Sequence, residues 1–138
     1  MPDVNDWNTR IIEEFRGNEG KVGGQFEGAP LLLLTTIGRR SGASRTNPMM
    51  YLDDTDRLLV FASKGGAPTD PDWYRNLVAQ PEVTVEVGTE TFPARAVVVE
   101  GEERDRIFAE QARRYPGFAE YQEKTDRIIP VVALFRQA

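Results

Sequence analysis

A segment of ten residues, 38–47, concentrates the side chains of this sequence that could bind an anion. Its sequence, GRRSGASRTN, holds three arginines, two glycines and four side chains with a hydroxyl or amide group. Guanidinium groups match the geometry of phosphate and carboxylate groups, and glycines let backbone N–H groups approach an anion closely. The spacing fits neither a Walker loop nor the GxGxxG pattern of dinucleotide-binding folds. The segment is therefore interpreted as an arginine cradle for an anion. The alternative is a solvated hairpin tip, since exposed turns use the same residue types.

The arginine cradle is a positive island in an acidic chain. The whole sequence carries a net charge of −5, but residues 28–52 contain three arginines and no acidic residue. The rest of the chain therefore carries −8. Nucleic-acid binding is disfavoured, because it usually needs a strong positive field. The distribution instead indicates a specific anionic ligand.

Cysteine and histidine are both absent from the 138 residues. Disulfides, thiolate chemistry and cysteine-ligated metals are thereby excluded, together with the commonest general base and the commonest metal ligand. No metal site is predicted. Any catalysis must use other groups.

Two further segments carry groups that suit a flat heteroaromatic ligand. Residues 63–66 place Lys64 and flexible backbone at the end of a predicted strand, and residues 72–76 place two aromatics and a guanidinium at the start of a predicted helix. A planar ring needs an apolar wall and a few placed donors. Taken alone, Trp73 and Tyr74 would be ordinary core residues and Lys64 an exposed lysine.

Three aromatic residues near the C-terminus, Tyr115, Phe118 and Tyr121, are spaced three apart. At this spacing the last two share one side of a helical region. Pro116 and Gly117 interrupt the preceding helix, so the segment is interpreted as a mobile aromatic cover for a hydrophobic substrate. The alternative is an ordinary hydrophobic helix face.

The elements that must position these groups are four helices and six short strands. Hydrophobic patterning and turn residues predict strands at 31–37, 45–52, 58–63, 83–87, 91–99 and 130–135. Helices are predicted from Asp6 to Gly17, from an Asp70 cap and Pro71 to Ala79, and over residues 102–114 and 118–125. Asp53, Asp54 and Asp56 are predicted to form a turn.

Strands in hairpin pairs, with helices inserted between hairpins, predict an antiparallel α+β protein and favour a barrel. The chain has the length of one domain, in which residues 1–28 form an N-terminal helix and glycine-rich loop and residues 29–138 the barrel. The longest apolar run, 31–37, is far shorter than the ~20 residues that span a bilayer. The acidic N-terminus lacks the pattern of a signal peptide, so a cytoplasmic protein is expected.

Three segments in order, GRRSGASRTNP, SKGGAPTDPDWYRNL and YPGFAEYQEKTDRIIPVVAL, resemble the deazaflavin-dependent nitroreductase family, whose members use coenzyme F420. The similarity covers residues 30–134. It implies an antiparallel split β-barrel like that of FMN-binding oxidoreductases, with inserted and flanking helices. It also implies a two-electron reductase, in which the reduced deazaflavin supplies the hydride and the protein binds and orients it. The phosphodiester and glutamate carboxylates of the coenzyme's tail would be the anions in the arginine cradle.

The resemblance also implies which residues form the site. Those expected to bind the coenzyme are Arg39, Arg40, Ser41, Arg45, Thr46, Asn47, Pro48, Met49, Met50, Phe61, Ala62, Ser63, Lys64, Asp72, Trp73, Tyr74, Arg75 and Asn76. The acceptor pocket is expected to be lined by Met50, Tyr115, Phe118 and Tyr121. A proton for the acceptor would come from Tyr115, Tyr121, Ser63 or water.

Two departures from the family pattern matter. Arg40 stands where many members have lysine, a change that keeps the charge. Phe118 and Met50 stand where nitroimidazole-reducing members have tyrosines, so the sequence favours F420 use over nitroreduction. The expected acceptor is a small planar organic compound such as a quinone or a nitroaromatic. An FMN-dependent reductase of the same fold and a non-catalytic deazaflavin-binding protein are the alternatives, and oligomeric state and peripheral membrane contact stay open.

Overall fold

The computed structural model describes residues 4–23, 30–54, 56–63, 66 and 69–137. Over these residues the helices are α1 (Val4–Gly17), α2 (Asp72–Ala79), α3 (Gly101–Arg114) and α4 (Gly117–Glu123). The strands are β1 (Leu31–Ile37), β2 (Ser44–Met50), β3 (Leu52–Asp54), β4 (Arg57–Phe61), β5 (Glu82–Val87), β6 (Glu90–Val99) and β7 (Val131–Arg136). No helix within this described part is long and apolar enough to cross a bilayer.

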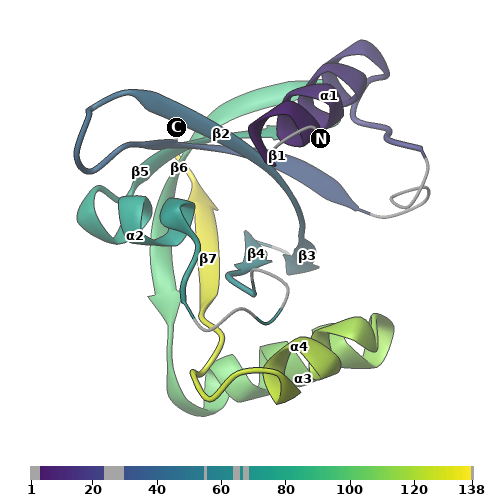
Figure 1. Cartoon of the computed structure of the whole chain (residues 1–138), viewed down its shortest axis with the longest axis vertical. Coiled ribbons are helices and arrows are strands. Elements are labelled where there is room, and N and C mark those ends of the chain that lie inside the picture. Colours follow the sequence, from purple (N-terminus) through teal and green to yellow (C-terminus); the bar gives the residue numbers. More distant parts are fainter. Residues whose placement is uncertain (1–3, 24–29, 55, 64–65, 67–68, 138) are drawn as a thin grey trace.

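The strands join one antiparallel sheet in the order β2-β1-β5-β6-β7-β4-β3. The sheet curls strongly, so that its edge strands β2 and β3 follow each other in sequence with only Tyr51 between them (Figure 1). α1 lies over β1 and β2, α2 lies beside the tip of the β1–β2 hairpin, and α3 and α4 lie together beyond β3 and β4 (Figure 1). This arrangement confirms the predicted α+β class with an antiparallel half-barrel.

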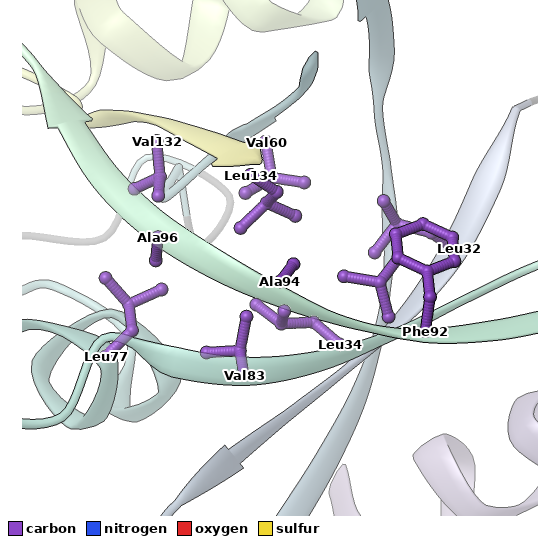
Figure 2. Packing of buried hydrophobic residues seen from close by; sticks show 11 residues of the cluster. Leu32, Leu34, Val60, Leu77, Val83, Phe92, Ala94, Ala96, Val132 and Leu134 are labelled. Atoms are coloured by element: carbon purple, nitrogen blue, oxygen red, sulfur yellow. The ribbon is translucent and has the colours of Figure 1, made fainter. Parts of the chain in front are cut away.

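The four leucines that begin β1 are all buried because both faces of the strand are covered. Leu32 and Leu34 point into the curl and belong to its core, which also takes side chains from β4, β5, β6, β7 and α2 (Figure 2). Leu31 and Leu33 point to the other face and pack with Phe15 of α1. Successive side chains of a strand alternate between faces. Burial of each leucine stabilises the fold by about 1.5–3 kcal/mol.

A second buried cluster fixes α3 and α4 to the sheet. Phe61, at the end of β4, meets Phe108 of α3 and Phe118 of α4 edge-on, with ring centroids 6.2 and 5.6 Å apart. Val131 and Ala133 of β7 pack in the same cluster. The two helices are therefore held by aromatic packing on the side of the sheet away from the core in the curl.

The predicted turn at Asp53 and Asp54 is wrong. Both residues belong to β3, where Asp54 pairs with Arg57 of β4. The Arg57 Nε donates to Asp54 Oδ2 at 2.9 Å, and the adjacent Leu52 is buried. Cross-strand pairing and the burial of Leu52 therefore override the turn preference of aspartate.

The predicted start of α2 is also corrected. The helix begins at Asp72, and Pro71 stands at its cap position without a side-chain cap hydrogen bond. Asp70 does not cap the helix, because its Oδ1 accepts a hydrogen bond from Arg127 Nη1 at 2.9 Å. The carboxylate is thus used by a partner 57 residues away instead of by the helix terminus.

Candidate functional site

A cavity of about 680 Å³ lies between the tip of the β1–β2 hairpin, the start of α2 and the first turns of α1. It brings together residues from segments that are far apart in the sequence. They are Asn8, Gly38, Arg39, Arg40, Ser41, Arg45, Asn47, Pro71, Asp72, Trp73 and Asn76. With three arginines and one aspartate, this lining carries a net positive charge. The arginine cradle is therefore one wall of a cavity.

The backbone of the hairpin tip is closed by its own hydrogen bonds. The Gly38 N–H donates to the Ala43 carbonyl at 2.8 Å, and the Gly42 N–H donates to the Gly38 carbonyl at 2.8 Å. The Ser41 Oγ accepts from the Ala43 N–H at 3.2 Å. Gly42 has a φ of +73°, a conformation that glycine adopts without strain. The arginines thus project from a defined turn.

Arg39 is held in place by α2. Its backbone N–H and its Nη1 both donate to Asn76 Oδ1, at 3.2 and 2.9 Å, and its Nη2 lies 3.5 Å from Asp72 Oδ1. Asn76 is only 4% exposed, and its Nδ2 donates to the buried Thr36 Oγ1 at 3.3 Å. One buried amide therefore joins the end of β1, the hairpin tip and α2.

Arg40 and Arg45 are arranged differently from Arg39. Both are exposed, and neither makes an ion pair or a side-chain hydrogen bond within the described residues. Their positive charges are therefore free to pair with an anion in the cavity. Such charge-assisted hydrogen bonds are roughly twice as strong as neutral ones.

Strand β2 directs its side chains to two faces, and only one of them lines the cavity. Arg45 and Asn47 face the cavity. Met49 follows on the same face and packs on the core inside the curl. Thr46, Pro48 and Met50 alternate with these residues; the Thr46 Oγ1 lies 2.8 Å from the Thr35 Oγ1, and Met50 packs against the cluster under α1. Thr46, Pro48 and Met50, which are predicted to bind the coenzyme, therefore have their side chains on the opposite face of β2 from the cavity.

The first turns of α2 supply a second wall. Trp73 and Asn76, three residues apart, both face the cavity, and Trp73 also packs on the core inside the curl. Tyr74 packs on that core but does not line the cavity; burial raises the pKa of its phenol, and the carboxylates of Asp70 and Glu100 raise it further. Arg75 is exposed and is not part of the lining.

Phe61, at the end of β4, and the following Ala62 and Ser63 are not part of the cavity lining. Phe61 and Ala62 are buried, and the Ala62 N–H donates to the Pro130 carbonyl at 3.0 Å. Ser63 is half-buried, and its carbonyl accepts from Arg127 Nη2 at 2.7 Å. Lys64 lies outside the described residues. The roles of these four residues in coenzyme binding stay predictions.

The aromatic residues predicted for the acceptor pocket share one cluster. Phe118 is 8% exposed, and its ring meets the ring of Tyr121 edge-on at 5.4 Å. Tyr115, at the end of α3, and Met50 pack against the same cluster. None of the four lines the cavity beside the arginine cradle. They are thus brought together with one another, and their role as an acceptor pocket stays a prediction.

Three contributors to the site, Thr36, Asn8 and Pro71, were not identified from the sequence. Thr36 accepts a hydrogen bond from Asn76. The sequence pattern could have indicated this role, because Thr36 is the one polar residue on the face of β1 that carries Leu32 and Leu34. Asn8 lines the cavity from α1. The apolar pattern of that helix predicts packing only, so its polar contribution had no signal.

The chain matches known proteins along almost its full length. A family model described as F420H(2)-dependent quinone reductase matches residues 7–136. An F420H(2)-dependent quinone reductase of Mycobacterium tuberculosis is 39% identical over 130 residues, which cover 89% of this chain and 85% of that protein. The solved structure of an F420-H2 dependent reductase is 42% identical with a TM-score of 0.69, covering 76% of this chain and 93% of that one. A protein solved as a domain-swapped dimer is 38% identical with a TM-score of 0.71, covering 96% and 99%.

Proposed function

Because the chain belongs to the F420H(2)-dependent quinone reductase family and is an F420-dependent reductase, we propose that it holds the coenzyme's anionic tail in the arginine-lined cavity and reduces quinones. The observation that carries the proposal is the pair of guanidinium groups at Arg40 and Arg45, which have no partner among the described residues, beside the fixed guanidinium of Arg39. In a chain of net charge −5, three arginines converging on one cavity favour a specific anion.

The chemistry of the lining fits this coenzyme. The phosphodiester and carboxylates of the tail match guanidinium donors, which bind such groups through two parallel hydrogen bonds. The Trp73 ring offers an apolar wall next to the polar groups of Asn47 and Asn76. A volume of about 680 Å³ lies within the usual range of sites for small ligands.

The protein's part in the reaction is binding, orientation and exclusion of water. The bound coenzyme supplies the hydride, which explains how a chain without histidine or cysteine can be a reductase. We propose that Tyr115, Tyr121 or Ser63 donates the proton that a reduced quinone needs. The hydroxyl groups of these residues make no hydrogen bond within the described part of the chain, so each can serve as a donor to a ligand.

Quinones are proposed ahead of nitroaromatics as acceptors. The relatives are named quinone reductases, and the acceptor-side cluster, in which Phe118 is buried, has a half-buried aromatic surface at Tyr115 and Tyr121. A planar quinone can stack on such a surface, with its carbonyl groups turned toward the phenols. Nitro compounds would find two phenols fewer than in nitroimidazole-reducing members of the family, because Met50 and Phe118 replace tyrosines.

Steady-state turnover tests the proposal. Purified protein is supplied with reduced F420 and with menadione or a nitroimidazole in turn, and oxidation of the coenzyme is followed by its absorbance. Turnover with menadione, and slower or no turnover with the nitroimidazole, is the expected result. Binding of F420 without turnover of any quinone would contradict the acceptor assignment. A flavin released on denaturation, with no response to F420, would contradict the coenzyme assignment.

A further inference from the structure

Arg127, between α4 and β7, joins both ends of the segment 62–70 that links β4 to α2. Its Nη1 donates to the Ala62 carbonyl at 3.0 Å, and its Nη2 donates to the Ser63 carbonyl at 2.7 Å. Its Nη1 also donates to Asp70 Oδ1 at 2.9 Å, forming an ion pair. One guanidinium group therefore holds the two residues that follow β4 and Asp70, which precedes α2.

The charge of Arg127 is compensated inside the protein. Only 14% of its side-chain surface is exposed, and Asp70 supplies a carboxylate. The two terminal nitrogens of its guanidinium group donate to two backbone carbonyls and to that carboxylate. Arg40 and Arg45, by contrast, have no such partner within the described residues. Arg127 is therefore suited to hold protein groups in position and not to bind an incoming anion.

Arg127 is itself fixed by the two C-terminal helices. Gln122 of α4 donates through Nε2 to the Arg127 carbonyl at 2.7 Å and accepts at Oε1 from the Ile129 N–H at 3.0 Å. Arg104 of α3 donates to the same Gln122 oxygen at 2.8 Å and to the Ile129 carbonyl at 3.0 and 2.8 Å. Residues 127–129 are therefore tied to the α3–α4 pair by polar side chains.

Gly66 brings the middle of the same segment against α4. Its φ is +83°, and a Cβ at this position would lie 2.7 Å from the Tyr121 carbonyl oxygen. Its N–H donates to the Ser63 carbonyl at 2.9 Å, the oxygen that Arg127 also binds. Both the backbone conformation and the close approach require glycine. Gly66 thus lies against the turn of α4 that carries Tyr121.

From these contacts we infer that Arg127 is a positioning residue that sets the geometry between the coenzyme side and the acceptor side of the site. The inference rests on the proposed function. Arg127 acts through Ala62, Ser63 and Asp70 on the segment before α2, and it is joined through Gln122 to the helix that carries the acceptor-side aromatics. Hydride transfer depends steeply on this geometry, and a misplacement of about 1 Å can lower a rate by roughly 10²-fold.

The cradle does not share this network. Its backbone is closed by contacts within the hairpin tip, and Arg39 is fixed by Asn76. Loss of Arg127 should therefore spare tail binding and impair the alignment of the ring with the acceptor. A substitution of Arg127 should therefore lower the turnover rate and leave the affinity for the coenzyme nearly unchanged, and the two quantities can be measured separately.

The test compares Arg127→Lys with Arg95→Lys. Lysine keeps the charge that pairs with Asp70 but cannot serve three acceptors with a rigid fork. We expect the Kd for oxidised F420 to stay within about 3-fold of the wild type and kcat with menadione to fall about 10- to 100-fold. Arg95 is 56% exposed and pairs with Glu82 at 3.0 Å on the surface, so Arg95→Lys should leave both values unchanged.

Hydrogen–deuterium exchange of the coenzyme-free protein supplies a second readout. Arg127→Lys should speed exchange within residues 62–70 about tenfold or more and leave β1 unchanged. If Arg127→Lys does not fold, Asp70→Asn, which keeps an acceptor oxygen and removes the charge, should give the same two changes to a smaller extent.

The outcomes distinguish a failure of the positioning role from a failure of the proposed function. A folded Arg127→Lys with unchanged kcat, beside an active wild type, overturns the positioning role alone. A lower kcat without faster exchange in residues 62–70 also overturns it, because the effect would not pass through that segment. A wild-type protein that neither binds F420 nor turns over a quinone overturns the proposed function and the positioning role with it.

Discussion

Arg39 and Asn76 are expected to contribute to coenzyme binding as one unit, and Asn76→Ala tests this. The substitution removes two hydrogen bonds to Arg39 and one to the buried Thr36 hydroxyl. A hydrogen bond to a charged group contributes about 1.5–3 kcal/mol and a neutral one about 0.5–1.5 kcal/mol, so the three together give about 2.5–6 kcal/mol. A quarter of the Arg39 side chain is exposed, at 25%, so water can replace part of this loss. The free energy of unfolding should therefore fall by about 2–3 kcal/mol, near the lower bound.

A double-mutant cycle with Arg39→Ala measures the consequence for the coenzyme. Arg39→Ala should weaken F420 binding by about 1.5–3 kcal/mol, or roughly 10- to 150-fold in Kd. Asn76→Ala alone should weaken it by about 1 kcal/mol, because the guanidinium loses its fixed orientation, and should add little once Arg39 is absent. Fluorescence titration gives each Kd, and urea unfolding gives each stability. Strictly additive losses, or an unchanged Kd in Arg39→Ala, would refute this reasoning.

The remaining predictions concern stability. The Gln111 side chain is fully buried, and neither its Nε2 nor its Oε1 has a hydrogen-bond partner in the part of the chain that the structure describes. Gln111→Leu should therefore raise the free energy of unfolding by about 1–3 kcal/mol, and a lower urea midpoint would contradict this. Gly66→Ala should lower stability by about 1–3 kcal/mol or more, because of the positive φ and the contact with the Tyr121 carbonyl. Gly17→Ala is the control, since a Cβ there meets nothing within 4 Å. Burial raises the pKa of Tyr74 above its ordinary value, so its contribution to stability is complete below about pH 10 and is lost as the pH rises through the folded pKa. Thermal melts at alkaline pH should show a shallower decline for Tyr74→Phe than for the wild type.

The sequence predicts the strands and the cradle because both depend on local patterns. The continuous apolar run of β1 and the residue types of the hairpin tip are properties of short segments. Arg45 and Trp73 come from different segments, yet both line the cavity, as expected for one ligand site. The β3 strand is missed because Asp53 and Asp54 have strong turn preferences that cross-strand pairing overrides.

Other features of the site depend on contacts that no local pattern specifies. Asp70 has the residue type of a helix cap, but its partner Arg127 lies far along the chain. The residues predicted to bind the coenzyme include the unbroken range 45–50. Side chains of β2 alternate between the two faces of the sheet, so those of Thr46 and Met50 point away from the cavity. Asn8 faces the cavity only because of how α1 packs on the sheet.

The most direct test of the account is a fluorescence titration of F420 against the double variant Arg40→Ala/Arg45→Ala, with Arg95→Ala as the exposed-arginine control. The two cradle guanidinium groups have no partner to lose within the described residues, so the melting temperature should stay near that of the wild type. The account predicts a Kd raised by about 100-fold or more in the double variant, from two lost charge-assisted contacts of about 1.5 kcal/mol or more each, and a Kd within about 2-fold of wild type in Arg95→Ala. Equal Kd values in all three proteins would contradict the claim that the arginine cradle holds the coenzyme's tail.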